Sequence, residues 1–170
     1  MKIPIRWIVV SVFLLSSSLN YLDRQILAAL APLLKTEFHL TNEDYGKIIS
    51  VFSITYAIAS PAAGWLLDRF GLTRGMTLAV AFWSIAGMAR GWTGGFFGLI
   101  SATAALGAGE AAGIPGAAKA GAIYLQPKER AIGSALSQIG LSIGAIAAPG
   151  ISTWLAISYG WRWAFVIPGL

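Results

Sequence analysis

Residues 131–161 read AIGSALSQIGLSIGAIAAPGISTWLAISYGW, a run of thirty-one residues without one charged side chain. Residues 48–67 form a second uncharged run, twenty residues long. The hydrocarbon core of a bilayer is about 30 Å thick, and about 20 helical residues are needed to cross it. Both runs are therefore long enough to span a membrane as helices, and the first can do so with a tilt.

The composition of the whole chain agrees with lipid as its solvent. The 170 residues are 56% hydrophobic and 11% charged, with a mean hydropathy of +0.71, whereas a soluble domain carries about 25% charged residues. Only helices and closed barrels cross lipid, because every main-chain polar group needs an internal partner there. Barrel strands would be about 10 residues long with strict alternation, so the long runs predict an all-α integral membrane protein.

We expect one transmembrane domain over residues 1–170, with five complete spans and the beginning of a sixth. Residues 41–44 read Thr-Asn-Glu-Asp, a composition typical of a helix N-terminus, and are expected to introduce the second span. The segment after Trp161 is too short to cross, so we expect a fragment whose C-terminal half is absent. The expected spans are 7–33, 45–67, 74–91, 95–118, 130–157 and an incomplete 161–170.

The basic residues indicate the orientation. The net charge is +5, but the basic residues lie singly between apolar runs, which favours topology signals over nucleic-acid binding. With a cytoplasmic N-terminus in the cell membrane, seven basic residues lie inside and four outside. The inner set is Lys2, Arg6, Arg69, Arg74, Lys119, Lys128 and Arg130; the outer set is Lys35, Lys47, Arg90 and Arg162.

Residue types that usually carry enzymatic or metal chemistry are scarce. There is no cysteine, the one histidine is His39 in a polar stretch, and no group of residues has metal-ligand spacing. We therefore expect no metal, no cofactor and no enzymatic activity. Gly140 and Gly144 form a GxxxG step, which predicts close packing of two helices in lipid.

Asp23, Arg24 and Glu110 are ionisable residues deep within apolar spans. Each costs about 2.5–3.5 kcal/mol there on insertion scales, which indicates a functional site. A purely structural ion pair between Arg24 and one acid is an alternative. Two acids and one base leave one carboxylate over, and an unpaired carboxylate in low dielectric tends to take up a proton. A proton-loading acid beside a fixed cation suits an anion/proton symporter.

Residues 64–75 read GWLLDRFGLTRG and follow the second expected span. This segment resembles the loop signature G-x-L-x-D-R-x-G-x-x-R of the major facilitator superfamily; a plain polar turn is the alternative. The matching residues are Gly64, Asp68, Arg69, Gly71 and Arg74. We expect the first to allow close helix contact, Asp68 to face a helix N-terminus across the interface between the two halves, and the two arginines to hold the loop on the inner side.

Four further segments look like the anion:cation symporter family, which includes bacterial hexuronate, aldonate and glucarate transporters. They are NYLDR at 20–24, GAGEA at 107–111, ERA at 129–131 and GWRWAF at 160–165. The resemblance implies that Arg24 binds the substrate carboxylate and that Asp23 and Glu110 carry the coupling protons. It also implies that Tyr21, Tyr56 and Gln138 bind sugar hydroxyls, with simple packing an alternative for the last two.

The chain departs from this family at Thr103, where the family has an arginine seven residues before the glutamate. The nearest alternative cation is Arg90, expected near the outer end of the third span. Without a cation at position 103, we expect Asp23 to lose a partner and to hold its proton more readily.

The expected fold is the N-terminal six-helix half of a major facilitator transporter. The expected function is proton-coupled symport of an organic anion, a sugar acid such as a hexuronate or an aldonate. Transport of another small carboxylate and export are alternatives within the same class, and a membrane-embedded sensor or enzyme is a remote one. The expected partners are the small anion, the lipid bilayer and the missing second half, with no nucleic acid.

Overall fold

The computed structural model describes residues 5–170, so Lys2, assigned to the inner side, lies outside the described residues. Within this range the chain is helical and has no strand, which confirms the all-α prediction. The α-helices are α1 (Ile5–Ala29), α2 (Ala31–Glu37), α3 (Asn42–Phe70), α4 (Leu72–Ala89), α5 (Phe96–Glu110), α6 (Gly113–Tyr124), α7 (Arg130–Tyr159) and α8 (Trp161–Val166). Three short 3₁₀ segments, η1 (Arg90–Trp92), η2 (Pro127–Glu129) and η3 (Ile167–Gly169), complete the described elements.

Five helical segments of the described chain are long and apolar enough to cross a membrane. They run Ile5–Ala29, Asn42–Phe70, Leu72–Trp92, Phe96–Tyr124 and Pro127–Tyr159. Many large apolar side chains on their outer surfaces are exposed, among them Ile58, Ile146 and Ile157, as expected for helices whose solvent is lipid. The protein is therefore a multi-pass membrane protein.

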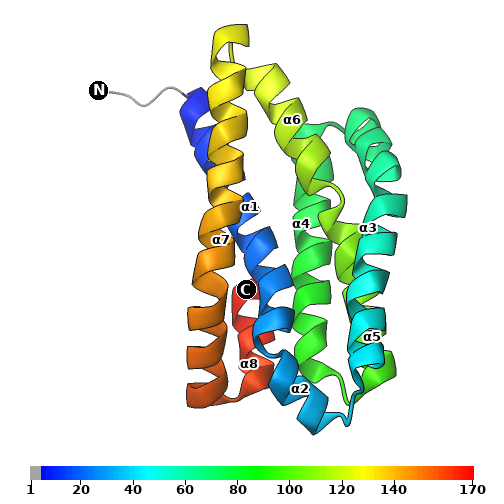
Figure 1. Cartoon of the computed structure of the whole chain (residues 1–170). Helices are drawn as coiled ribbons and strands as arrows, with labels where there is room; N and C mark the ends of the chain where they lie inside the picture. The colour runs from blue at the N-terminus through cyan, green and yellow to red at the C-terminus, as the bar shows by residue number, and fades with distance from the viewer. Residues whose placement is uncertain (1–4) are drawn as a thin grey trace.

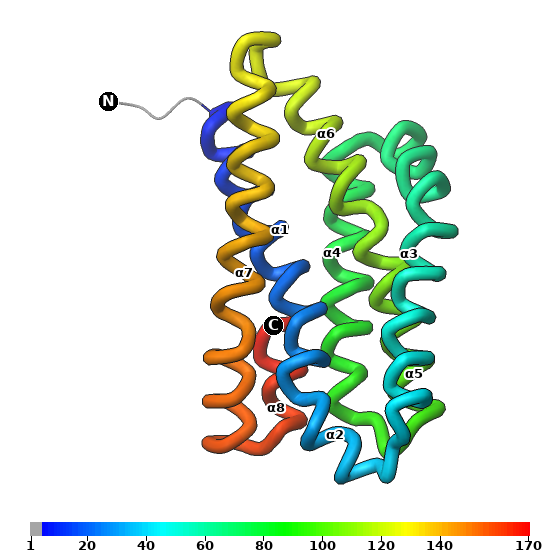
Figure 2. Tube along the Cα trace, viewed as in Figure 1, coloured from blue at the N-terminus to red at the C-terminus, as the bar shows by residue number. Residues whose placement is uncertain are grey.

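The helices stand side by side in a bundle, with α7 beside α1 and α5 beside α3 (Figure 1). The N-terminal end of α1, the α3–α4 loop and the α6–α7 connection lie at one end of the bundle, and α2 and the α7–α8 turn lie at the other (Figure 1). The tube in Figure 2 shows α8 entering the bundle beside α7 and ending within it. In this bundle the buried charges of α1, η1 and the C-terminal end of α5 come into contact through their side chains.

The GxxxG step explains why α1 and α7 lie so close. A Cβ atom built at Gly140 would meet the main-chain oxygen of Leu14, and one at Gly144 would meet that of Ser18. Only glycine fits at either position, because the backbone of α1 occupies the space that a side chain would need. The predicted helix contact at this step is confirmed.

Two expected spans are interrupted in the structure, and a proline lies beside each interruption. The first span was expected to run to residue 33, but α1 ends at Ala29 and α2 begins at Ala31 with Pro32 in its first turn. The fourth was expected as one stretch to residue 118, but it breaks after Glu110 and resumes as α6 up to Tyr124. Pro115 cannot donate to the carbonyl four residues earlier, and its ring crowds that carbonyl.

The second span begins as the Thr-Asn-Glu-Asp stretch indicated, although its bounds are wider than expected. The Thr41 hydroxyl oxygen accepts from the main-chain N–H of Asp44 at 3.1 Å, and the Asp44 carboxylate accepts from the N–H of Thr41 at 3.1 Å. This reciprocal capping box satisfies donors that the first turn of α3 would otherwise leave unpaired. The connection before α3 is also shorter than expected, because residues 31–37 form α2.

Candidate functional site

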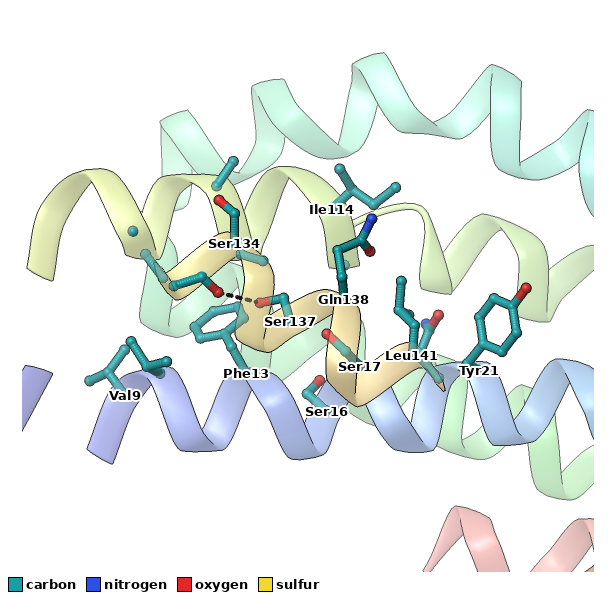
Figure 3. A pocket seen from close by; sticks show the side chains of 18 of the residues that line it. Val9, Phe13, Ser16, Ser17, Tyr21, Ile114, Ser134, Ser137, Gln138 and Leu141 are labelled. Carbon is teal, nitrogen blue, oxygen red and sulfur yellow. Dashed lines mark hydrogen bonds between the residues drawn. The ribbon is translucent and has the colours of Figure 1, made fainter. Parts of the chain in front are cut away.

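A cavity of about 590 Å³ opens mainly between α1, α6 and α7. Figure 3 shows its serine-rich part, where Ser17 of α1 lies near Gln138 of α7 and Tyr21 lies farther along α1. Five of the residues that the sequence singled out line this cavity: Tyr21, Arg24, Tyr56, Glu110 and Gln138. Asp23 is not among the lining residues. Of the two neighbouring charged residues of α1, Arg24 therefore lines the cavity and Asp23 does not.

Arg24 and Glu110 form an ion pair in the wall of the cavity. The Nε of Arg24 donates to Oε2 of Glu110 at 2.6 Å. The glutamate side chain is fully buried, whereas 27% of the arginine side chain is exposed. The cation of this pair can therefore be reached from the cavity, while the carboxylate lies behind it.

Aromatic rings hold the guanidinium of Arg24 from the side of α3. Its Cζ lies 4.7 Å from the ring centres of both Phe52 and Tyr56, and 6.0 Å from that of Tyr21. The rings of Phe52 and Tyr56 are themselves stacked, 6.0 Å apart. Such cation–π contacts orient a guanidinium without using its hydrogen-bond donors. The sequence analysis missed Phe52, although it lies one helical turn before Tyr56.

Asp23 turns away from the cavity, toward Arg90 of η1, which directly follows α4. Two terminal nitrogens of Arg90 donate to the main-chain oxygen of Asp23 at 3.0 and 3.1 Å, and Nη2 lies 3.7 Å from its Oδ1. The guanidinium also stacks on Phe165 of α8, 4.7 Å from the ring centre. Both charged side chains are almost completely buried, at 1% and 2% exposed.

This second pair corrects two expectations. The sequence analysis counted two acids and one base in the membrane, but Arg90 makes the count two and two. Asp23 therefore keeps a cationic partner although Thr103 replaces the family's arginine. Arg90 was also counted among the basic residues on the outer side, but it lies inside the bundle. The count of inner against outer basic residues therefore becomes seven against three.

Besides Nε of Arg6, four buried side-chain atoms of α1 and α5 have no hydrogen-bond partner among residues 5–170. They are Nδ2 of Asn20, Oδ1 of Asp23, Oγ1 of Thr103 and Oε1 of Glu110. Buried polar groups are rarely left unpaired in proteins, and water or a ligand usually satisfies them. The sequence analysis did not select Asn20, although it opens the NYLDR segment.

Serine hydroxyls continue the polar lining along the cavity. Figure 3 shows Ser16 and Ser17 on α1 and Ser134 and Ser137 on α7 beside Gln138. Ser137 donates to the main-chain oxygen of Gly133 at 3.3 Å, the contact drawn as a dashed line. Small hydroxyl-bearing residues among apolar neighbours gave no distinct signal in the sequence, because each alone is common in membrane helices.

Comparison with known proteins identifies the family to which this helical bundle belongs. The sequence profile of the Major Facilitator Superfamily matches residues 13–170. The chain belongs to the Major Facilitator Superfamily. The described helices are the N-terminal half of its fold with a short sixth helix, as the sequence predicted.

Two curated relatives of this superfamily member are sugar-acid carriers by name. The hexuronate transporter of Escherichia coli K12 is 35% identical over 97% of this chain, which covers 38% of that protein. The galacturonate transporter of Dickeya chrysanthemi is 32% identical over 97% of this chain, which covers 48% of it. The chain thus spans less than half the length of either relative.

Solved structures of a bacterial homologue of the human lysosomal transporter Spinster share the fold. In the inward-facing, occupied form the TM-score is 0.88 at 24% identity, over 99% of this chain and 42% of that one. In the inward-facing, unoccupied form the TM-score is 0.84 at 26% identity, over 99% and 41% of the two chains. These likenesses support the arrangement of the helices.

The superfamily loop has a clear local geometry between α3 and α4. Gly71 lies at the turn with a φ of 81°, a conformation that favours glycine. Asp68 pairs with Lys119 of α6 at 2.8 Å, and the same ammonium donates to the main-chain oxygen of Leu67 at 2.7 Å. Lys119 therefore ties α6 to the C-terminal end of α3, which the sequence analysis did not foresee.

The remaining loop residues make fewer contacts. The guanidinium of Arg69 lies 5.4 Å from the ring centre of Trp65, and Arg74 is exposed. Gly64 was expected to allow a close helix contact, but a Cβ built there would lie 4.0 Å from the Cβ of Pro115, an ordinary separation. Gly64 thus lies at ordinary contact distance from α6, and a closer helix contact at this glycine stays a prediction.

Proposed function

We propose that this chain supplies the N-terminal half of a secondary transporter that carries an organic anion, specifically a sugar acid such as a hexuronate or an aldonate, together with protons. The observation that carries the proposal is the Arg24–Glu110 pair, whose cation is accessible from the cavity and whose carboxylate is buried. A fixed cation at the wall of a membrane cavity is a site for an anion. The names of the sugar-acid relatives support the same substrate class.

Arg24 can bind a carboxylate while its aromatic contacts stay in place. Its hydrogen bond to Glu110 uses only Nε, and a guanidinium has five N–H donors in a planar fork. The terminal nitrogens can therefore take a substrate carboxylate in the two-bond geometry that arginine favours. Tyr21, Tyr56 and Gln138 line the same cavity, and we assign them to the hydroxyl groups of the substrate.

Glu110 couples anion binding to a proton. When the substrate carboxylate satisfies Arg24, Glu110 no longer has an unshared cation beside it, and a buried carboxylate without one is better accommodated as the neutral acid. A proton and the anion then occupy the site together. Two halves that rock about this site expose it alternately to either side. No covalent step is involved, and we place the N-terminus in the cytoplasm.

The test measures uptake of radiolabelled galacturonate and galactonate into proteoliposomes that hold the full-length transporter carrying this chain. We expect an inward proton gradient to drive accumulation, and we expect Arg24→Ala to abolish it. Glu110→Gln should abolish accumulation while leaving exchange of substrate across the membrane, because exchange needs no release of the proton. Movement of other small carboxylates without these two would refute the sugar-acid assignment, and no movement under any gradient would refute transport.

A further inference from the structure

The two buried ion pairs differ in what happens to the cation when the acid takes up a proton. Arg24 borders the cavity, so a substrate carboxylate can replace Glu110 as its partner. Arg90 has no such replacement, because it is 1% exposed and does not line the cavity. The proton on Glu110 can thus be compensated by the substrate, whereas a proton on Asp23 cannot.

Arg90 is held where it is by contacts that do not involve the Asp23 carboxylate. It donates twice to the main-chain oxygen of Asp23, and it stacks on Phe165. An arginine does not lose its proton in proteins. Neutral Asp23 would therefore leave a fixed, buried cation without a carboxylate in salt-bridge contact among residues 5–170, which is strongly unfavourable. The charged side chains around the two acids are Arg24, Arg90 and the acids themselves, within residues 5–170.

We propose that Arg90 is a positioning residue that keeps Asp23 ionised throughout the transport cycle, so that Glu110 alone exchanges a proton and one proton moves with each monovalent sugar acid. This inference rests on the proposed function and revises the coupling role that the sequence suggested for Asp23. One proton with one monoanion transfers no net charge. Transport of galacturonate should therefore respond to a pH gradient and be indifferent to the membrane potential.

The first experiment counts protons with the full-length transporter in proteoliposomes. The membrane potential is clamped at zero, and the inside is one pH unit more alkaline than the outside. The experiment measures the ratio of inside to outside galacturonate concentration at which the net flux reverses. We expect reversal at about a tenfold ratio for one proton, against about one-hundredfold for two. Reversal near one-hundredfold would overturn the inference, whereas absence of any galacturonate flux would overturn the proposed function itself.

The second experiment removes the pair as a unit. Asp23→Asn combined with Arg90→Met eliminates both charges, and we expect this double variant to keep gradient-driven accumulation within about threefold of the parent. Loss of accumulation with exchange retained would show that Asp23 carries a coupling proton and would overturn the inference. The control is Arg162→Met, because Arg162 also stacks on an aromatic ring of α8, at 4.4 Å from that of Trp161, but is exposed. If the double variant does not fold, the reversal ratio still decides.

Discussion

The Asp23–Arg90 pair predicts a large and specific effect of removing a single charge. Asp23→Asn keeps the side-chain volume and the main-chain oxygen that accepts two hydrogen bonds from Arg90. It removes the negative charge 3.7 Å from the guanidinium, in a place where both side chains are buried. Breaking a buried pair by removing one partner costs about 3–5 kcal/mol, and the retained hydrogen bonds place the expected loss near the lower limit, about 3 kcal/mol.

The assay is the free energy of unfolding of the full-length transporter in detergent micelles, for Asp23→Asn, Arg90→Met and the double variant. We expect the double variant to recover at least about 2 kcal/mol relative to the sum of the single variants, because it leaves no buried charge uncompensated. Glu43→Gln is the matched control. Glu43 pairs with Lys47 at 2.8 Å, but 77% of its side chain is exposed, so its loss should cost less than about 1 kcal/mol. A loss below about 1 kcal/mol for Asp23→Asn, or additive single variants, would refute the pairing.

Three further predictions test packing, the anion site and the orientation. Gly144→Ala should destabilise the protein by about 1–3 kcal/mol because its Cβ meets the backbone of α1, whereas Gly150→Ala, with nothing within 4 Å, should be neutral or stabilising; equal effects would contradict the packing. Arg24→Lys should raise the KM for galacturonate at least about tenfold, because an ammonium cannot make the planar two-bond contact, and an unchanged KM would argue against Arg24 as the anchor. In a background otherwise free of cysteine, Lys128→Cys should react with an impermeant maleimide only from the cytoplasmic side and Lys35→Cys only from outside; the reverse pattern would invert the topology.

The membrane helices could be predicted because their cause is local. A run of uncharged residues such as 131–161 must be helical in lipid whatever its neighbours are, and the structure confirms α7 there. The break after Glu110 was also encoded locally, in Pro115, although the expected range treated the span as continuous. Spacing alone indicated the contact at Gly140 and Gly144, since a GxxxG step places both glycines on one helix face.

The partner of Asp23 could not be predicted in the same way. Arg90 is 67 residues away in sequence, and its position near the end of a span suggested a charge at the membrane surface. Which way its side chain turns depends on how α4 packs against α1 and α8, and no local pattern records that. The contact of Asp68 with Lys119 was missed for the same reason, because it depends on how α6 crosses α3.

The order of Asp23 and Arg24 along α1 has a direct physical consequence. Consecutive residues of a helix point about 100° apart, so two adjacent charges cannot serve the same partner. Here Arg24 turns toward the cavity and Glu110, while Asp23 turns into the bundle and Arg90. One turn of α1 thus carries one charge that borders the cavity and one that does not. The side chain of Arg24 is therefore open to another partner from the cavity, whereas the Asp23–Arg90 pair links α1 to η1 inside the bundle.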